Sequence, residues 1–515
     1  MMKKNMLYFL LATALLTSCT GKFDDMNKNP AKLSDAGARE LPFMFTRAQS
    51  AATIHRPYYQ TISILMPDLY AQYFALTTTS FQTDRYVMND GWLSRPGIIT
   101  YVLTLPQLQT IFDNTERSSG EYALANIMMT YTFHRLTDYY GPVPYFEAGQ
   151  ASSSIAYDPQ DKIYDDLFKR LDSAVTNLKA GTAANVFGNY DIIYEGNVQQ
   201  WIRFANTLRL RLALRISKVD PARAKTEAEA AVAGGVMTAA SHSAYIKRSA
   251  KGDDANGLAT NAVNNEFSMS STMASYLKGY NDPRLPIYFQ PAVASGQFKG
   301  LRNGSSATDI NKPGNRPAQT SNVGPRWVNW NGATWIGQLE ATQPVMHAAE
   351  AWFLRAEGAL NGWNMDGTAQ ELYEKGIAAS MQEWGINDLT VINSYITSAA
   401  VPAAPGDEAG SPAVAATPVK WAATGSMQRL QIGTQKWLAL YPDGQEAWAE
   451  FRRSGYPVMY PVLQSDNSDL PAGTFINRLP YSSVEASTNG AALEKARQML
   501  GGPDNAATRV WWDVD

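Results

Sequence analysis

Cysteine and histidine are scarce in this 515-residue sequence, which contains one cysteine, Cys19, and four histidines. A single cysteine excludes an internal disulfide framework, and it also excludes a zinc site built from several cysteines. The histidines are scattered along the chain, which argues against a metal centre built from imidazoles. The sequence therefore predicts no metal site.

Charged residues are also few: they make up 18% of the chain, against about 25% in an average soluble domain. The 44 basic and 47 acidic residues leave a net charge of −3. Proteins that bind nucleic acid usually carry a basic excess or stripe, so this balance argues against a nucleic-acid partner. Apolar residues make up 45%, enough for a substantial core, and there are 13 Trp and 26 Tyr.

Long hydrophobic runs are missing as well, because no segment approaches the roughly 18 uninterrupted apolar residues of a transmembrane helix. Residues 6–16 are apolar apart from Thr13, and they follow Lys3 and Lys4. A basic start followed by a short apolar stretch is typical of a secretory signal peptide. We therefore expect the protein to be exported and not to span a membrane.

Residues 16–19 read LTSC, which resembles a bacterial lipobox, in which the cysteine is acylated and becomes the new N-terminus. The alternative is an ordinary signal peptide with an incidental cysteine. We predict a signal peptide over residues 1–18 and a mature chain of 515 − 18 = 497 residues that begins at Cys19. Several acyl chains, palmitate among them, would make the membrane anchor stable.

Most of the mature chain has the apolar spacing of amphipathic helices, as in residues 160–178. The helices come in pairs with short Gly, Pro or Asp turns: 119–138 with 160–179, 197–217 with 221–233, 341–361 with 368–384, and 425–440 with 444–453. Such pairs stack, because two helices cannot bury both apolar stripes alone. The sequence predicts a mostly α fold with about four tetratricopeptide-like pairs, although the strict tetratricopeptide consensus is absent.

Two long segments interrupt this pattern. Residues 247–339 are rich in glycine and contain the β-prone runs 285–289 and 326–330, which predicts a loop-rich insertion with short β-strands. Insertions of this length in a helical scaffold usually carry function. Residues 398–420 are rich in alanine and proline, which favours a flexible loop.

The strongest candidate for ligand binding is residues 324–337, GPRWVNWNGATWIG, with Trp327, Trp330 and Trp335 close together and Asn329 and Asn331 between them. The Asn-Gly pair predicts a hairpin turn. Tryptophan faces match the apolar C–H face of a sugar, and asparagine amides match its hydroxyls. The alternative is that some of these rings form a local core. The odd spacing of Trp327 and Trp330 places them on opposite sides of a strand, so we do not expect all three to contact ligand.

A second candidate is residues 86–95, YVMNDGWLSR, which contain Tyr86, Asn89 and Trp92. The Asn-Asp-Gly sequence predicts a turn that presents Trp92. The alternative for Trp92 is that it belongs to the core.

Several strings of the sequence are familiar in combination. They are YTFHRLTDYYGPVPYFEA at 131–148, NDPRL at 281–285, AEAWFLRAEGAL at 349–360, IGTQKWLALYPDGQEAWAEFRRSGYP at 432–457, and RLPYSSVE at 478–485. In this order and behind a lipobox, they resemble the SusD/RagB family of outer-membrane nutrient-binding lipoproteins. The resemblance covers nearly the whole mature chain.

The resemblance implies one mostly helical domain over residues 19–515, with four tetratricopeptide-like pairs and a loop-rich binding face. It implies a non-catalytic protein that binds oligosaccharides and is lipid-anchored at the surface of a Gram-negative outer membrane. The implied partner is a TonB-dependent SusC-like transporter. The family places ligand contacts in an early region and in a loop before the AEAWFLRAEGAL-type helix, which corresponds to our two candidate segments by region only.

Two other functions stay open at this point. The same architecture could capture oligopeptides or another nutrient, although we find no concentrated charge cluster in the insertion that would hold peptide termini. A secreted glycoside hydrolase is the other alternative, because its paired carboxylates would be close only in space. Glu350 and Glu357 lie two helical turns apart, but we expect them to pair with arginines such as Arg355. No nucleophile elbow, zinc-protease motif, P-loop or dinucleotide fingerprint is present, so no cofactor is predicted.

Overall fold

The computed structural model describes residues 37, 39–150, 152, 154–471 and 473–515. The predicted signal peptide and Cys19 lie outside the described residues. Within the described ranges, no helix combines the length and the apolar character that crossing a bilayer requires.

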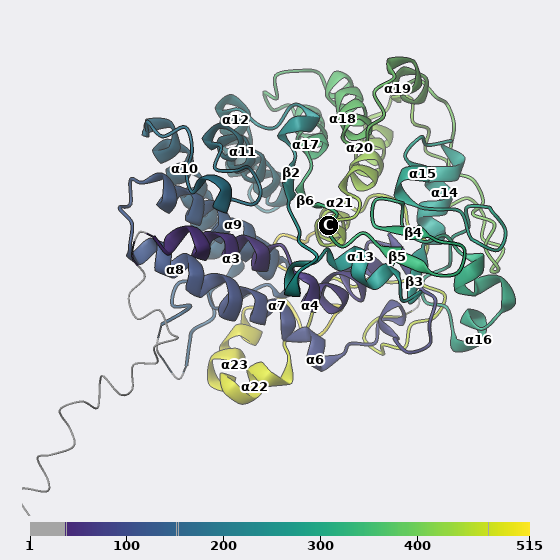
Figure 1. Cartoon of the computed structure of the whole chain (residues 1–515), viewed down its shortest axis with the longest axis horizontal. Coiled ribbons are helices and arrows are strands. Elements are labelled where there is room, and N and C mark those ends of the chain that lie inside the picture. The colour runs from purple at the N-terminus through teal and green to yellow at the C-terminus, as the bar shows by residue number, and fades with distance from the viewer. Residues whose placement is uncertain (1–36, 38, 151, 153, 472) are drawn as a thin grey trace, which may run out of the picture.

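The protein is mostly helical, and its main feature is a set of helical pairs (Figure 1). All four predicted pairs are present: α9 (Gly120–Tyr140) with α10 (Gln160–Ala180), α11 (Val198–Arg215) with α12 (Pro221–Gly234), α17 (Ala348–Leu360) with α18 (Ala369–Glu383), and α20 (Gly425–Leu440) with α21 (Gly444–Ser454). The prediction of tetratricopeptide-like pairs is confirmed.

Local capping explains why these helices begin where they do. The side chain of Asn197 accepts a hydrogen bond from the Gln200 amide at 3.1 Å, and Asp220 caps α12 through the Arg223 amide at 3.2 Å. Both caps satisfy backbone N–H groups that have no partner inside a helix. Pro221 follows at the first helical position, where its missing N–H costs nothing.

Two predicted elements are wrong in type. Residues 341–347 are not helical: Gln343–Met346 forms strand β6, which pairs with β2 (Ala244–Ile246), and α17 starts only after His347. Pro344 lacks the N–H that a continuing helix would use, so strand pairing is the better local solution. The run at 285–289 is a helical turn, α15 (Leu285–Tyr288), with Pro286 in its first turn. The run at 326–330 does contain a strand.

The remaining elements are short and cover the rest of the chain. The other helices are α3 (Leu41–Ala52), α4 (Arg56–Tyr59), α5 (Pro67–Tyr70), α6 (Asp90–Leu93), α7 (Arg95–Gly97), α8 (Leu105–Asp113), α13 (Gly257–Ala262), α14 (Ser271–Gly279), α16 (Ala307–Ile310), α19 (Leu389–Ile396), α22 (Ser483–Thr488) and α23 (Gly490–Gln498), with π-helical turns at Gln60–Ile64 and Ile98–Thr104. The described strands form three antiparallel pairs: β1 (Phe74–Leu76) with β3 (Phe267–Met269), β2 with β6, and β4 (Val328–Trp330) with β5 (Trp335–Gly337).

The alanine- and proline-rich segment 398–420 has no helix or strand, but its backbone is anchored to the helices. The hydroxyl of Tyr280 donates to the Thr417 carbonyl at 2.8 Å, and the hydroxyl of Tyr373 donates to the Val419 carbonyl at 2.7 Å. Buried tyrosines thus satisfy carbonyls that a loop leaves without partners.

Buried charges join the helical pairs to one another. Arg211 of α11 holds Glu350 of α17 by two hydrogen bonds of 2.7 and 2.6 Å, and both side chains are 1% exposed. Arg453 of α21 holds Glu357 in the same way, at 2.8 and 2.6 Å. Glu350 and Glu357 therefore pair with arginines as predicted, but Arg355 is not their partner. Arg355 instead donates to the backbone of the loop after α17.

Candidate functional site

The tryptophan-rich segment folds into the β4–β5 hairpin that its Asn-Gly pair predicts. The strands are in register, with Trp330 opposite Trp335. The Asn331 amide donates to the Thr334 carbonyl at 3.1 Å. The Asn331 side-chain oxygen accepts from the amides of Ala333 and Thr334 at 2.9 and 2.8 Å. Asn331 therefore builds the turn, and its carbonyl oxygen is occupied by that role.

Trp330 and Trp335 form a pair across the hairpin. Their ring centroids are 5.2 Å apart and their planes meet at 60°. Trp330 is 39% exposed, whereas Trp335 is only 8% exposed. Such tilted pairs are mutually stabilising, so Trp335 supports the ring of Trp330 from the protein side. Trp330 is the aromatic ring of this segment that a ligand can reach.

Trp327 is fully buried and cannot contact a ligand in this structure. Its exposed fraction is 0%, and its ring lies 5.8 Å from the rings of both Trp384 and Tyr441. Trp327 and Trp330 thus have opposite environments, but Trp327 lies before β4, so the alternation of side chains along a strand does not account for the difference. Trp327 belongs to the core, and we leave it out of the candidate contact set.

The base of the hairpin is fixed to the rest of the protein. The Gln290 side chain donates to the Val328 carbonyl at 2.8 Å. Gly337 lies against helix α13, and a Cβ at this position would stand 2.8 Å from the Ala259 carbonyl oxygen. Glycine is therefore needed for this close approach. The hairpin combines a rigid base with an exposed tip.

Asn329 and Ile336 are opposite each other in the hairpin and are both exposed. Because side chains alternate along a strand, they lie on the face opposite to Trp330. A ligand that stacks on the Trp330 ring would therefore lie on the face away from Asn329. Ile336 was not among the predicted site residues. Its signal in the sequence is a single aliphatic residue between the Asn-Gly turn and Gly337.

The second candidate segment lies around α6. Trp92 is half-buried, and its ring meets Phe81 edge to face at a centroid distance of 5.7 Å. Asn89 is exposed at the start of α6. Tyr86 is buried, its ring lies 6.4 Å from that of Tyr70, and burial raises its pKa above the usual value. Of the three predicted residues, Asn89 and Trp92 are accessible and Tyr86 is not.

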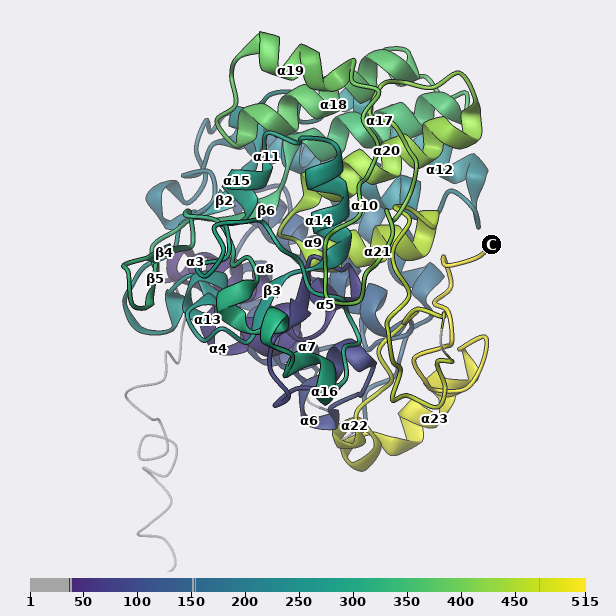
Figure 2. The same ribbon diagram turned by 90° about the vertical axis from the view of Figure 1, so that its right-hand side faces the viewer.

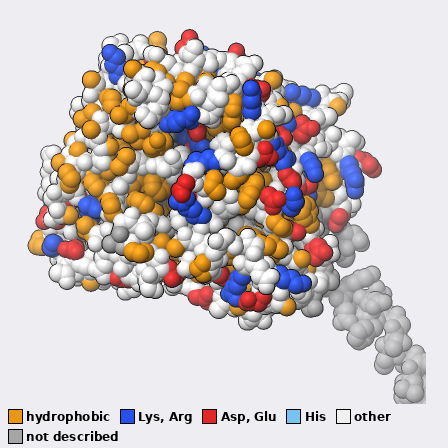
Figure 3. All heavy atoms as spheres, turned by 180° about the vertical axis from the view of Figure 1, so that it is seen from behind, with side chains coloured by type: hydrophobic (Ala, Val, Ile, Leu, Met, Phe, Trp, Pro, Cys, Tyr) orange, Lys and Arg blue, Asp and Glu red, His pale blue; other side chains and the backbone are white. Residues whose placement is uncertain are grey.

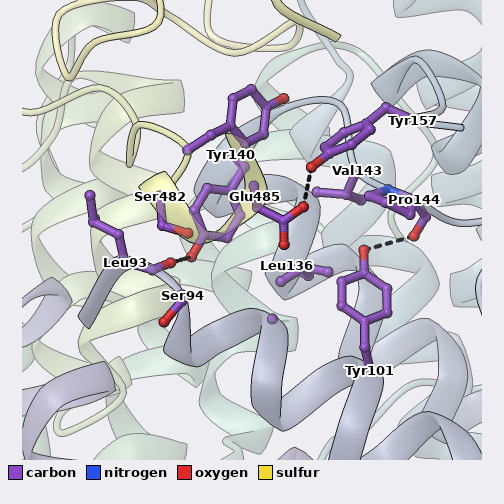
Figure 4. A pocket seen from close by; sticks show the side chains of 12 residues that line it. Leu93, Ser94, Tyr101, Leu136, Tyr140, Val143, Pro144, Tyr157, Ser482 and Glu485 are labelled. Carbon is purple, nitrogen blue, oxygen red and sulfur yellow. Dashed lines mark hydrogen bonds between the residues drawn. The ribbon is translucent and has the colours of Figure 1, made fainter. Parts of the chain in front are cut away.

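A tyrosine-lined cavity lies beneath this segment (Figure 4). Its volume is about 30 Å³, room for little more than one water molecule. Tyr101 donates to the Pro144 carbonyl at 2.7 Å, and Tyr140 donates to the Leu93 carbonyl at 2.5 Å. The Tyr157 hydroxyl bonds to the Glu485 carboxylate. These three hydroxyls already have partners within the protein, so they are not free to hold a ligand.

The structure does not bring the two candidate segments into one pocket. Figures 1 and 2 both place α6 apart from the β4–β5 hairpin. Phe81, which sequence reasoning missed, supports Trp92 as Trp335 supports Trp330. An isolated aromatic residue in the polar run TTTSFQT was the signal for it. The described residues offer no cluster of three or more His, Cys, Asp or Glu side chains that could hold a metal.

Comparisons with known proteins agree on one family. A family model described as SusD-like, "Susd and RagB outer membrane lipoprotein", matches residues 25–513. A chitin-binding SusD homologue from Flavobacterium johnsoniae is 35% identical with a TM-score of 0.84, and the match covers 92% of this chain and 99% of that chain. A SusD-like protein from Bacteroides thetaiotaomicron is 31% identical over 92% and 99% of the two chains, with a TM-score of 0.82.

A further solved structure, described as a chitin-binding protein, is 27% identical with a TM-score of 0.77 and covers 92% of this chain and 100% of that chain. None of the curated proteins matches the chain.

Proposed function

Because the chain belongs to the SusD-like family of outer-membrane lipoproteins, we propose that it captures oligosaccharides and binds them without chemical change. The observation that carries this proposal is the exposed ring of Trp330, held from behind by Trp335 on a fixed hairpin. A flat, preorganised aromatic face suits the apolar side of a pyranose ring. The chitin-binding description of a 35% identical structure supports β-linked N-acetylglucosamine oligosaccharides as the first ligands to test.

Trp92 and Asn89 provide a second contact in this proposal. Trp92 offers a half-buried ring and Asn89 offers an amide with both donor and acceptor groups. Because the two segments are apart in Figures 1 and 2, a ligand that touches both must be an extended oligosaccharide. Short sugars would contact the hairpin alone.

Calorimetric titration with chitin oligosaccharides tests the proposal. Trp330→Ala should weaken binding about tenfold to a hundredfold, because central aromatic contacts each contribute on the order of 2 kcal/mol. Ile336→Ala is the matched control, since Ile336 is exposed on the opposite face of the same hairpin. Equal loss in both variants would show that the hairpin fold, and not the Trp330 face, is responsible.

The alternatives have distinct outcomes in the same assay. Binding of oligopeptides but of no glycan, with the same dependence on Trp330, would replace the sugar by a peptide ligand. Release of reducing ends from chitin oligosaccharides by the purified protein would indicate a glycoside hydrolase. Hydrolysis is not expected, because the Glu350 and Glu357 carboxylates are buried in ion pairs.

The proposal also includes an anchor and a partner. Acylation of Cys19 would tether the protein to the outer surface of the outer membrane, where it would deliver ligand to a TonB-dependent SusC-like transporter. Cys19→Ala should abolish incorporation of labelled palmitate and release the protein from membranes. Membrane association that persists in the variant, without label on the wild type, would contradict the anchor. Co-purification of a large barrel protein with the anchored wild type would support the partner.

A further inference from the structure

A second, larger cleft lies among the helical pairs. Its volume is about 700 Å³, and it is lined by the connection between α11 and α12, by the ends of α17 and α21, and by one side of α20. Figure 2 places α12, α20 and α21 toward the right of the view and the β4–β5 hairpin at its left edge. Small-molecule sites typically measure about 300–1,000 Å³, so the cleft is large enough for a ligand of several rings.

The residues that line the cleft carry more positive than negative charge: Lys218, Arg429 and Arg453 against Glu357 and Glu450. Arg453, together with the buried Lys436 behind the cleft lining, neutralises the carboxylates of Glu357 and Glu450. Arg429 also lines the cleft and is half-buried, but no ion pair or hydrogen bond joins it to any residue that the structure describes. An arginine that is partly removed from water without a partner retains five unused donors.

Lys218 adds a second cation on the other side of the cleft. One of its donors is used on the Val514 carbonyl, at 2.7 Å. Asp513 and Asp515 of the C-terminal segment also face Lys218, and Asp515 is paired with Arg509 at 2.6 Å. Burial, followed by the charge of Arg453, lowers the pKa of Lys218 despite these carboxylates. An added negative charge in the cleft would therefore be favourable.

Two half-exposed aromatic rings complete the cleft. Tyr456 packs on Gly433, where a Cβ would stand 2.5 Å from that of Tyr456. Arg429 lies one helical turn before Gly433 on the same face of α20, and both Arg429 and Tyr456 line the cleft. Trp363 packs on Gly358 at the end of α17, also within the cleft lining. Each ring offers an apolar face, and neither polar tip is hydrogen-bonded within the described chain.

We propose that this cleft is a second ligand site, separate from the hairpin, that takes a saccharide carrying a carboxylate, such as a uronic acid oligosaccharide. Trp363 and Tyr456 provide faces for sugar rings, and Arg429 provides the planar fork that matches a carboxylate. A neutral sugar would leave Arg429 without a partner. A cationic ligand would meet like charge at Arg429 and Lys218. The inference goes beyond the capture of neutral glycans at the hairpin.

Figure 3 shows the face that carries this part of the molecule, with Lys, Arg, Asp and Glu side chains gathered over the helical pairs. Both signs of charge are present on this face.

The test is calorimetric titration of the wild-type protein with tri-galacturonate and with its methyl ester. The acid and the ester share their rings and hydroxyls and differ in charge. We expect the acid to bind at least tenfold more tightly than the ester, and Arg429→Gln to reduce acid binding to the level of the ester. Trp363→Ala should weaken both ligands. Arg429 is half-exposed, so an unchanged melting temperature of Arg429→Gln confirms that the variant is folded.

Trp330→Ala is the control that separates the two sites. If the acid binds in this cleft, the hairpin variant should bind it as the wild type does. Loss of acid binding in Trp330→Ala but not in Arg429→Gln would overturn the proposal and assign the acid to the hairpin. Equal affinity for acid and ester, or no binding of either at millimolar concentration, would also overturn it. Binding of an acidic peptide but not of the uronate, dependent on Arg429, would reject the saccharide class.

Discussion

The helical pairs and the β4–β5 hairpin differ in which side chains they bury and which they expose. The pairs bury charges, as in the Arg211–Glu350 contact, where both side chains are 1% exposed. The hairpin exposes an aromatic ring, Trp330, at its tip. The first arrangement stabilises one packing of distant helices, and the second leaves an apolar face available for a ligand. Buried ion pairs therefore stabilise the fold, whereas an exposed ring such as Trp330 can bind a ligand.

The cost of each arrangement explains this separation. Taking two charges out of water is expensive, and only a well-formed hydrogen-bonded pair recovers the cost. A buried pair therefore tolerates little change at either partner. An exposed ring loses part of the gain that burial would provide, on the order of 25 cal/mol per Å² of apolar surface. A ligand that covers this exposed surface can recover that gain when it binds.

The largest expected effect comes from breaking a buried pair. Arg211→Met leaves Glu350 without its bidentate partner and should lower the free energy of unfolding by about 3–5 kcal/mol. Denaturant unfolding measures this loss. Arg56→Met is the control, because the Arg56–Asp253 pair is exposed and such pairs contribute about 0–1 kcal/mol. Similar losses in both variants would show that burial does not decide the value of these pairs.

Asp84 is a buried acid outside the helical pairs, and its pKa can be compared with that of an acid within them. Burial would raise the pKa of Glu450 in α21, but Arg453 and Lys436 hold it below its usual value. Asp84 has no ion pair of this kind among the described residues, and burial raises its pKa to about 7 although backbone hydrogen bonds and the charge of Arg85 oppose the rise. The folded state then binds this proton more tightly than the unfolded state. The stability that Asp84 contributes is complete below about pH 4 and is lost as pH rises to 7.

We therefore expect Asp84→Asn to remove a pH-dependent loss of about 2–3 kcal/mol between pH 5 and pH 8. Unfolding of wild type and variant at both pH values measures the difference between them. A difference that stays constant with pH would mean that Asp84 is ionised in the folded protein, in the same way as the acids of the helical pairs.

Trp327 and Trp330 allow the comparison to be made within one segment. Trp327→Phe should reduce the free energy of unfolding by about 1–2 kcal/mol, because it removes part of a buried ring. Its affinity for glycan should stay unchanged. Reduced glycan affinity at an unchanged melting temperature would place Trp327 among the ligand contacts, contrary to its burial.

The helical pairs could be predicted because their signals are local. Asn197 and Asp220 cap the helices that follow them, and the apolar period repeats within one helix. Strand β6 could not be separated from α17 in this way, because a buried strand and a buried helical turn both read as short apolar runs. The partner of Glu350 could not be predicted either, because Arg211 is 139 residues away.

The hairpin was predictable in shape but not in exposure. The Asn-Gly pair indicates the turn, and the turn fixes Trp330 opposite Trp335. Which of the two rings is covered depends on where the hairpin rests on the protein, and that is a tertiary property. Arg429 has no ion-pair partner among the described residues, and this is also a tertiary property, because it depends on how distant helix ends pack.

The smallest expected effect concerns Trp92, and it depends on ligand length. The α6 segment and the hairpin lie apart, so only a long oligosaccharide can reach both. Trp92→Ala should weaken binding of a chitin hexasaccharide about fivefold, or roughly 1 kcal/mol, and leave the disaccharide unchanged. Calorimetric titration with both lengths measures this. An equal loss for both lengths, with a lower melting temperature, would mean that Trp92 acts through its packing on Phe81 and belongs with the residues that hold the fold.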